Sequence, residues 1–204
     1  MTGILAVQSD GFVRQELGDG GARWIAEEIF RGHGCRVAMV NYPTGHVVRD
    51  HIENAAEVLY VIDGPIKVQG VMEAAHSGSL LSCGPMASLE FSSGDGPVAW
   101  LSISSPERTG NATLIREHID DTKLSSSASD CGSLVTKDEI EKMPWATRSG
   151  NRYLRERPIF PQGHYLPVTM VKAEVLNEER LVAAHWTLLF VVAGTLRVND
   201  TFCK

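Results

Sequence analysis

Four residues in the first half of the chain carry side chains that can act together in chemistry: Arg49, His51, Glu53 and Glu57. Because the side chains of a strand alternate between two faces, Arg49, His51 and Glu53 are predicted to share one face. A turn over residues 54–56 then lets Glu57, at the start of the returning strand, meet His51 and Glu53 inside a closed sheet. One imidazole and two carboxylates form a donor set suited to Fe(II), Mn(II), Zn(II) or Ni(II).

The same residues allow other interpretations. A salt bridge from Arg49 to Glu53 or Glu57 would neutralise the charge without a metal. Alternatively, the carboxylates act with His51 as a metal-free acid and base, because burial raises the pKa of a carboxyl group toward neutrality. Arg49 can also bind a carboxylate or phosphate of a substrate. We therefore keep His51, Glu53 and Glu57 as candidate metal ligands, and all four as candidate catalytic residues.

Short β-prone runs must position these side chains. The clearest runs are residues 36–42, 57–62, 66–69 and 98–103, with turn signals at residues 42–45, 63–65 and 94–97. This pattern is typical of an antiparallel sandwich or barrel. One short helix is also expected, because Thr136 and Glu139 have capping-box spacing and Pro144 ends the helix.

Residues 45–64 resemble the first motif of the cupin superfamily, G-x5-H-x-H-x3-E-x6-G. The signature positions that match are Gly45, His51, Glu57 and Gly64, and Glu53 stands where the family has its second histidine. The resemblance implies an all-β fold, the cupin double-stranded β-helix or jelly-roll barrel.

The second cupin motif, G-x5-P-x-G-x2-H-x3-N, normally supplies the last histidine ligand, and this chain fits it poorly. Starting from Gly78, one register places Leu89 at the histidine position, and a shift by one places Glu90 there. The resemblance alone therefore does not imply a complete metal site.

A shift of the sequence by 130 positions places residues 29–69 on residues 159–199. Residues 37–40, Val-Ala-Met-Val, match residues 168–171, Val-Thr-Met-Val, after a slip of one. We interpret this similarity as a duplicated barrel, a bicupin whose second unit is degenerate and incomplete. Its ligand positions hold Leu181, Ala183 and Thr187, which cannot bind a metal. The predicted parts are a cupin barrel at 1–118, a linker with the bridging helix at 119–150, and a partial second unit at 151–204.

Composition excludes several classes of partner. The net charge is -6 over 204 residues and no basic run occurs, so we expect neither a nucleic acid nor a membrane as partner. The N-terminus lacks the pattern of a secretory signal, and the apolar run 188–193 is too short to span a bilayer, so we expect a cytoplasmic protein. The four cysteines form no C-x-x-C pair, which argues against a zinc ribbon or dithiol redox centre.

Two functions follow from the resemblance, since the cupin fold serves both. We expect a small-molecule enzyme of the oxidoreductase, isomerase or lyase type, acting on a small organic acid or sugar-like substrate, with an optional divalent metal and no organic cofactor. The alternative is a non-catalytic ligand-binding or regulatory cupin without metal, which Leu89 favours. Because residues 57–62 are apolar on both faces, we also expect them to pack against a second sheet or another subunit, in a homodimer.

Overall fold

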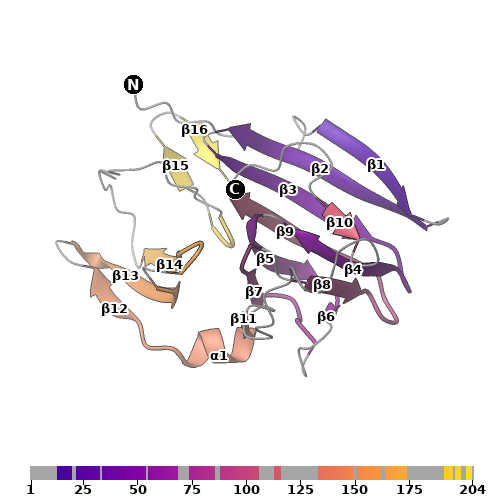
Figure 1. Cartoon of the computed structure of the whole chain (residues 1–204). Coiled ribbons are helices and arrows are strands. Elements are labelled where there is room, and N and C mark those ends of the chain that lie inside the picture. Colours follow the sequence, from indigo (N-terminus) through magenta and orange to yellow (C-terminus); the bar gives the residue numbers. More distant parts are fainter. Residues whose placement is uncertain are drawn as a thin grey trace.

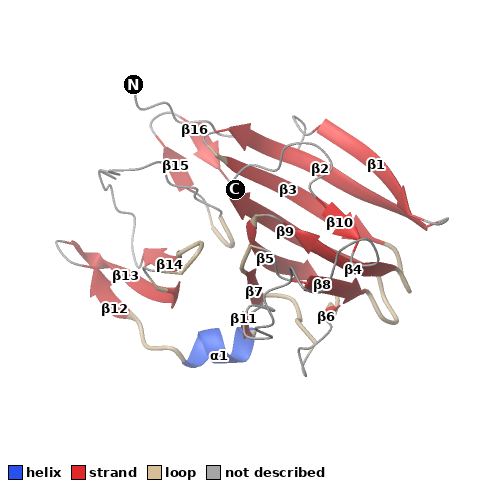
Figure 2. Ribbon diagram, in the orientation of Figure 1, coloured by secondary structure: helices blue, strands red, loops and turns tan. Residues whose placement is uncertain are grey.

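Antiparallel strands dominate the computed structural model of the chain (Figures 1 and 2). The structure describes residues 13–19, 22–32, 34–53, 55–68, 74–85, 88–105, 113–115, 133–148, 151–161, 164–173, 191–194, 196–198 and 201–203. Within these ranges the only helix is α1, Lys137–Lys142. No helix in the same ranges is long and apolar enough to cross a membrane.

A seven-stranded antiparallel sheet forms one layer of the barrel. Its strands follow the order β1-β2-β3-β9-β5-β7-β11. Their bounds, in that order, are Val13–Asp19, Ala22–Gly32, Cys35–Tyr42, Val98–Ser105, Ala56–Asp63, Leu80–Cys83 and Ser133–Val135. The strands predicted at 36–42, 57–62 and 98–103 are therefore confirmed, and they lie side by side as β3, β5 and β9 with β9 in the middle.

A four-stranded antiparallel sheet, in the order β10-β4-β8-β6, forms the opposite layer. Its bounds, in that order, are Thr113–Ile115, Val47–Glu53, Ser88–Ser92 and Lys67–Val68. From β3 to β9, successive strands alternate between the two sheets, which is the jelly-roll arrangement. The predicted all-β jelly-roll barrel with one short helix is therefore confirmed.

Apolar side chains between the two sheets form the core of the barrel. They occur at every second position of the central strands, as the two-residue period of a strand requires. Phe91 of β8 contributes from the second sheet and packs against Trp100 of β9, with ring centroids 6.1 Å apart. Burial of each large apolar side chain contributes about 1.5–3 kcal/mol. The cluster comprises Ala38, Val40, Tyr42, Leu59, Val61, Ile66, Ala75, Leu81, Cys83, Phe91, Val98 and Trp100.

The outer face of the seven-stranded sheet is covered by the C-terminal part of the chain. Val58 of β5 and Leu80 of β7 pack against Ile140 of α1, and against Ile159 and Phe160 of the strand β13, Asn151–Phe160. The apolar outer face predicted for residues 57–62 is thus buried within the same chain, whereas the expected homodimer stays a prediction.

The helix α1 begins and ends as its sequence predicts. The Thr136 backbone N–H donates to the Glu139 carboxylate at 2.8 Å, and the Glu139 backbone N–H donates to the Thr136 hydroxyl at 3.3 Å, which completes the capping box. The Thr136 backbone N–H and the Thr136 hydroxyl both donate to the Glu139 carboxylate, and these two hydrogen bonds lower the pKa of Glu139. At the other end, the buried guanidinium of Arg157 donates to the carbonyls of Ile140 and Glu141.

A smaller three-stranded antiparallel sheet, in the order β12-β13-β14, follows the helix. Its strands are Ala146–Arg148, Asn151–Phe160 and Val168–Ala173, and a separate hairpin joins β15, Leu196–Val198, to β16, Thr201–Cys203. The segment predicted as a linker, 119–150, also supplies β11, which pairs with β7 of the barrel. Residues 119–132 and 149–150 of that segment lie outside the described residues.

Candidate site at the polar end of the barrel interior

The interior of the barrel changes from apolar to polar along the strand β5. Val61 and Leu59 belong to the apolar core, and Glu57 occupies the next position on the same face. In the sheet, Glu57 lies opposite Ser104 of β9 on one side and Cys83 of β7 on the other. Glu57 is only 5% exposed and Ser104 is fully buried. This row of residues forms a polar end inside an otherwise apolar barrel.

A short hydrogen bond holds the Glu57 carboxylate. The Ser102 hydroxyl of β9 donates to Glu57 Oε1 at 2.5 Å. Ser102 is itself buried. The neighbouring strand therefore fixes the orientation of the carboxylate before any ligand arrives.

The Ser104 hydroxyl is a second polar group in this row. It is buried, and it has no hydrogen-bond partner among the described residues. Buried hydroxyl groups almost always have a partner, supplied by protein, water or ligand. Ser104 therefore marks a position beside Glu57 where a polar ligand or a water molecule is expected.

Charged residues continue the row on the neighbouring strands β2 and β3. Arg36 lies opposite Ser104 in the sheet, and its Nε donates to Glu28 Oε2 at 3.0 Å. Arg31 donates to the same carboxylate at 2.6 Å. The hydrogen bond from Arg31 is the main reason why the pKa of Glu28 lies below its ordinary value, with Arg36 adding to the effect. Two guanidinium groups thus share one carboxylate in this region.

The other predicted site residues, Arg49, His51 and Glu53, lie in β4 of the opposite sheet. Their side chains are outside the described part of the structure, so the predicted convergence with Glu57 stays a prediction. The backbone pairing with β8 shifts register between Val48 and His51. Two residues of β4, 49 and 50, therefore stand against the single residue 90 of β8 in the pairing.

Backbone register also locates the second cupin motif. Leu89 of β8 is the cross-strand partner of His51. Of the two registers that the sequence allowed, the one that places Leu89 at the histidine position agrees with this pairing. Leucine has no donor atom, so this neighbour of His51 cannot serve as the last metal ligand of the motif.

The chemistry of the candidate donors fits a divalent metal only in part. Glu57 supplies a buried, oriented carboxylate. No cluster of three His, Cys, Asp or Glu side chains suited to a metal occurs among the described residues. The side chains of His51 and Glu53 lie outside the described part of the structure. A metal at this position therefore needs both His51 and Glu53 in addition to Glu57.

Sequence analysis missed two serines and one histidine. Ser102 and Ser104 alternate with apolar residues in β9, but serine alone carries no signal for a buried site. His46 is also buried, and it stacks on Tyr42, with ring centroids 4.4 Å apart. The aromatic ring of Tyr42 covers it because the turn at Gly45 folds the chain back.

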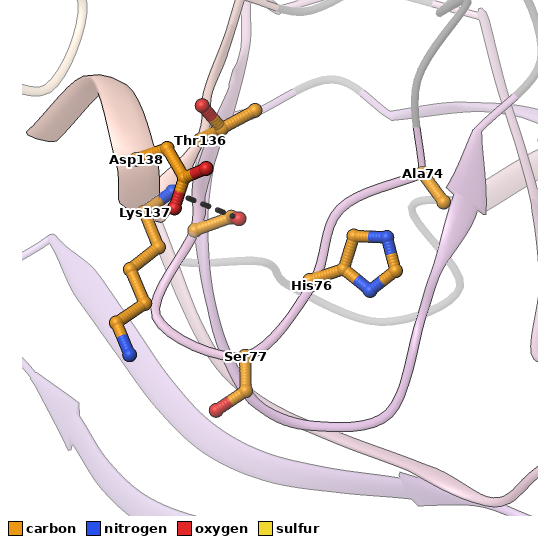
Figure 3. A pocket seen from close by; sticks show the side chains of 7 residues that line it. Ala74, His76, Ser77, Thr136, Lys137 and Asp138 are labelled. Atoms are coloured by element: carbon orange, nitrogen blue, oxygen red, sulfur yellow. Dashed lines mark hydrogen bonds between the residues drawn. The ribbon is translucent and has the colours of Figure 1, made fainter.

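A groove of about 480 Å³ lies outside the barrel (Figure 3). The loop around His76 and Ser77 forms one wall, and the first turn of α1, with Lys137 and Asp138, forms the other. Ser79 also lines the groove, and it lies directly before Leu80, the first residue of β7. Cys83, the cross-strand partner of Glu57, is at the other end of β7. The groove is therefore separate from the polar end of the barrel.

Comparisons with known proteins place the chain among structures of one architecture. No family model and no curated protein sequence matches it. An RmlC-like cupin from Shewanella frigidimarina is 16% identical, with a TM-score of 0.44, over 50% of this chain and 89% of that one. KdgF from Halomonas is 15% identical, with a TM-score of 0.43, over 50% of this chain and 94% of that one. PAC13 from Streptomyces, in a structure with uridine, is 13% identical, with a TM-score of 0.44, over 55% of this chain and 90% of that one.

The chain has a jelly-roll fold. Because the TM-scores lie below 0.5, this assignment depends on the strand order of the two sheets and not on these similarities. The comparisons leave the duplication of the barrel untested. The polar end around Glu57 is the part of this jelly roll in which chemistry can be sought.

Proposed function

We propose that the chain is a cupin-type enzyme that acts on a small molecule at the Glu57 end of the barrel. The observation that carries this proposal is the pair of buried polar groups there: a carboxylate that accepts a hydrogen bond from Ser102, and the hydroxyl of Ser104, which has no partner among the described residues. Burying a hydroxyl without a partner costs free energy. A polar ligand beside Glu57 would supply that partner. Small organic acids and sugar-like molecules match both the polarity and the size of such a barrel.

The residues of the chain have distinct parts in this proposal. Glu57 would hold the ligand or accept its proton, with its orientation set by Ser102. Ser104 would donate a hydrogen bond to a ligand oxygen. Arg49 would bind an anionic group of the substrate, as we expect from its charge.

We further propose that His51, Glu53 and Glu57 hold a divalent metal of the Fe, Mn, Zn or Ni type. Such an ion would supply Lewis-acid or oxygen-activating chemistry to a chelating substrate. The support is the nature of the three donors and the buried, oriented carboxylate of Glu57.

Metal content tests this assignment directly. We expect the purified chain to hold close to one metal ion per protein molecule by elemental analysis, and we expect His51→Ala, Glu53→Ala and Glu57→Gln each to lose most of it. The control is Glu141→Gln, which removes an exposed carboxylate on α1, and it should keep the full content. Equal metal content in all the variants would rule out these ligands.

A non-catalytic binding or regulatory cupin without metal is the second candidate, and the placement of Leu89 beside His51 favours it. In that case the wild type contains no metal but is still stabilised against heat by a small organic acid or sugar acid, because a ligand that binds only the folded state raises its stability. A Ser104→Ala variant should weaken that stabilisation. Metal in the wild type together with turnover would exclude this candidate.

A further inference from the structure

One row of residues crosses five strands of the seven-stranded sheet at the polar end of the barrel. The cross-strand partners run from Arg31 of β2 through Arg36 of β3, Ser104 of β9 and Glu57 of β5 to Cys83 of β7. Residues directly opposite each other on neighbouring strands point to the same face of a sheet. Because Glu57 shares its face of β5 with the apolar core, the row lies on the interior side of the sheet.

Arg36 has donors in this row that the fold does not use. A guanidinium group carries five N–H donors, and Nε of Arg36 donates to Glu28 Oε2 at 3.0 Å. The N–H groups of its two terminal nitrogens donate to none of the described residues. The side chain is only 13% exposed, so water reaches a small part of it. A charged group with unused donors in such a place is suited to binding a ligand.

The Ser104 hydroxyl lies beside these donors. Ser104 is the cross-strand partner of Arg36, it is fully buried, and its Oγ has no hydrogen-bond partner among the described residues. Side chains directly opposite each other in a sheet have Cβ atoms about 4.5–5.5 Å apart. One ligand group of the size of a carboxylate can therefore contact both residues.

The charges of this region favour an anionic ligand group. Arg31 and Arg36 share the carboxylate of Glu28, so two positive charges stand against one negative charge. Glu57 does not form an ion pair with Arg36, whose carboxylate partner is Glu28, and β9 lies between their two strands. A carboxylate beside Arg36 and Ser104 would neutralise the excess positive charge.

We propose that Arg36 and Ser104 bind the carboxylate of the ligand, and that the barrel takes hydroxy acids or sugar acids rather than neutral sugars. A guanidinium binds a carboxylate through two parallel N–H···O hydrogen bonds, and the serine hydroxyl donates a third. The rest of the ligand then extends toward Glu57 on the next strand. This inference rests on the proposed function, because it requires a ligand at the Glu57 end of the barrel.

Two pairs of probes test the wild-type chain without any substitution. They are lactate with propane-1,2-diol, and gluconate with sorbitol, and the members of each pair differ only by a carboxylate in place of a CH2OH group. We expect the acid of at least one pair to bind at least about tenfold more tightly than its neutral partner, because hydrogen bonds to an ionised acceptor are stronger. Isothermal titration calorimetry at pH 7 measures the affinities. Equal affinities within both pairs, or no binding of either acid, would overturn the proposal.

Substitutions then locate the carboxylate. Arg36→Gln should lower the affinity for the preferred acid at least about tenfold, toward that of the neutral partner. Arg36→Lys keeps a cation for Glu28 but lacks the planar pair of donors, so it should fold normally and still lose most of the preference. Ser104→Ala should weaken the acid about three- to tenfold. The matched control is Arg31→Gln, which removes an equal charge from the same carboxylate, and it should change the affinity less than about threefold.

The outcomes separate this inference from the proposed function. If acid binding is unchanged in Arg36→Gln and Arg36→Lys but falls in Glu57→Gln, the site stands and the assignment of the acid group is wrong. Equal losses in Arg31→Gln and Arg36→Gln, or a loss in Arg49→Gln alone, would also overturn it. If acid binding depends on Arg36 while metal and turnover are absent, the assignment stands and the chain is a non-catalytic binder.

Discussion

At the scale of single residues, the hydrogen bond from Ser102 holds a buried carboxylate, Glu57, inside the barrel. A buried carboxylate costs several kcal/mol unless donors compensate for its lost hydration. Ser104, in the same strand, has no partner among the described residues. The two serines are therefore a matched pair, alike in chemistry and burial but different in what they bind.

Removal of each hydroxyl should have different effects on stability. We expect Ser102→Ala to lower the free energy of unfolding by about 1–3 kcal/mol, because Glu57 loses a donor. Ser104→Ala should change it by less than about 0.5 kcal/mol, since the Ser104 hydroxyl bonds to none of the described residues. Urea unfolding of metal-free protein at pH 7 measures both. Equal decreases in the free energy of unfolding for the two variants would show that the hydrogen bond from Ser102 does not stabilise the fold.

Glu28 should make stability depend on pH in the acidic range. Its pKa is lowered from the ordinary value of 4.5, first by the hydrogen bond from Arg31 and then by Arg36. The folded chain therefore binds this proton less tightly than the unfolded chain does. The stability that the ionised group contributes is present above the unfolded-state pKa and is lost as the pH falls through the lowered folded-state pKa.

The variant Glu28→Gln isolates this effect. At pH 7 we expect it to be less stable than the wild type, by no more than about 1 kcal/mol because solvent screens the pairs. The difference should shrink steadily as urea unfolding is repeated from pH 5 downward. A difference that stays constant down to pH 2.5 would contradict the assigned role of the carboxylate.

At the scale of elements, the turn after β5 is set by a close approach between two chain segments. Gly64 has a φ of 73°, and a Cβ placed there would overlap the Pro97 carbonyl oxygen and the Val98 side chain. The turn thus combines a left-handed backbone with a contact that only glycine permits. This contact brings the start of β9 against the end of β5.

The pair Gly64→Ala and Gly34→Ala separates the contact from the backbone strain. Gly34 has a φ of 74°, but a Cβ there meets nothing within 4 Å. We expect Gly34→Ala to cost about 1 kcal/mol from strain alone. Gly64→Ala should cost at least about 2 kcal/mol more, because backbone must move. Thermal unfolding followed by circular dichroism compares them, and similar melting temperatures would disprove the contact.

The central strands of the barrel could be predicted because their signals are local. Residues 57–62 show the apolar character of a strand covered on both faces, and Gly64 closes the run. The order of the strands could not be predicted, since it depends on pairings between distant segments such as β3 and β9. The register shift between Val48 and His51 was missed for the same reason. The role of Ser104 becomes visible only when β9 is placed beside β5.

At the scale of the whole molecule, the barrel depends on the C-terminal part for its outer surface. Val58 and Leu80 would be exposed without Ile140, Ile159 and Phe160. The strand β11 extends the barrel sheet and the helix α1 packs on its outer face, so residues after 118 contribute to both. The domain boundary at residue 118 stays a prediction. The homodimer and the cytoplasmic location stay predictions.

Tyr60 belongs to both of the apolar clusters on the outer face of the barrel sheet. Burial of its ring raises the pKa of the phenol above 10.0. The Tyr60 ring therefore links the cluster around Val58 of β5 with the cluster around Val37 of β3 and Leu101 of β9. Separating either cluster from the sheet would expose the same Tyr60 ring to water. The barrel and the layer packed on it should therefore unfold as one cooperative unit.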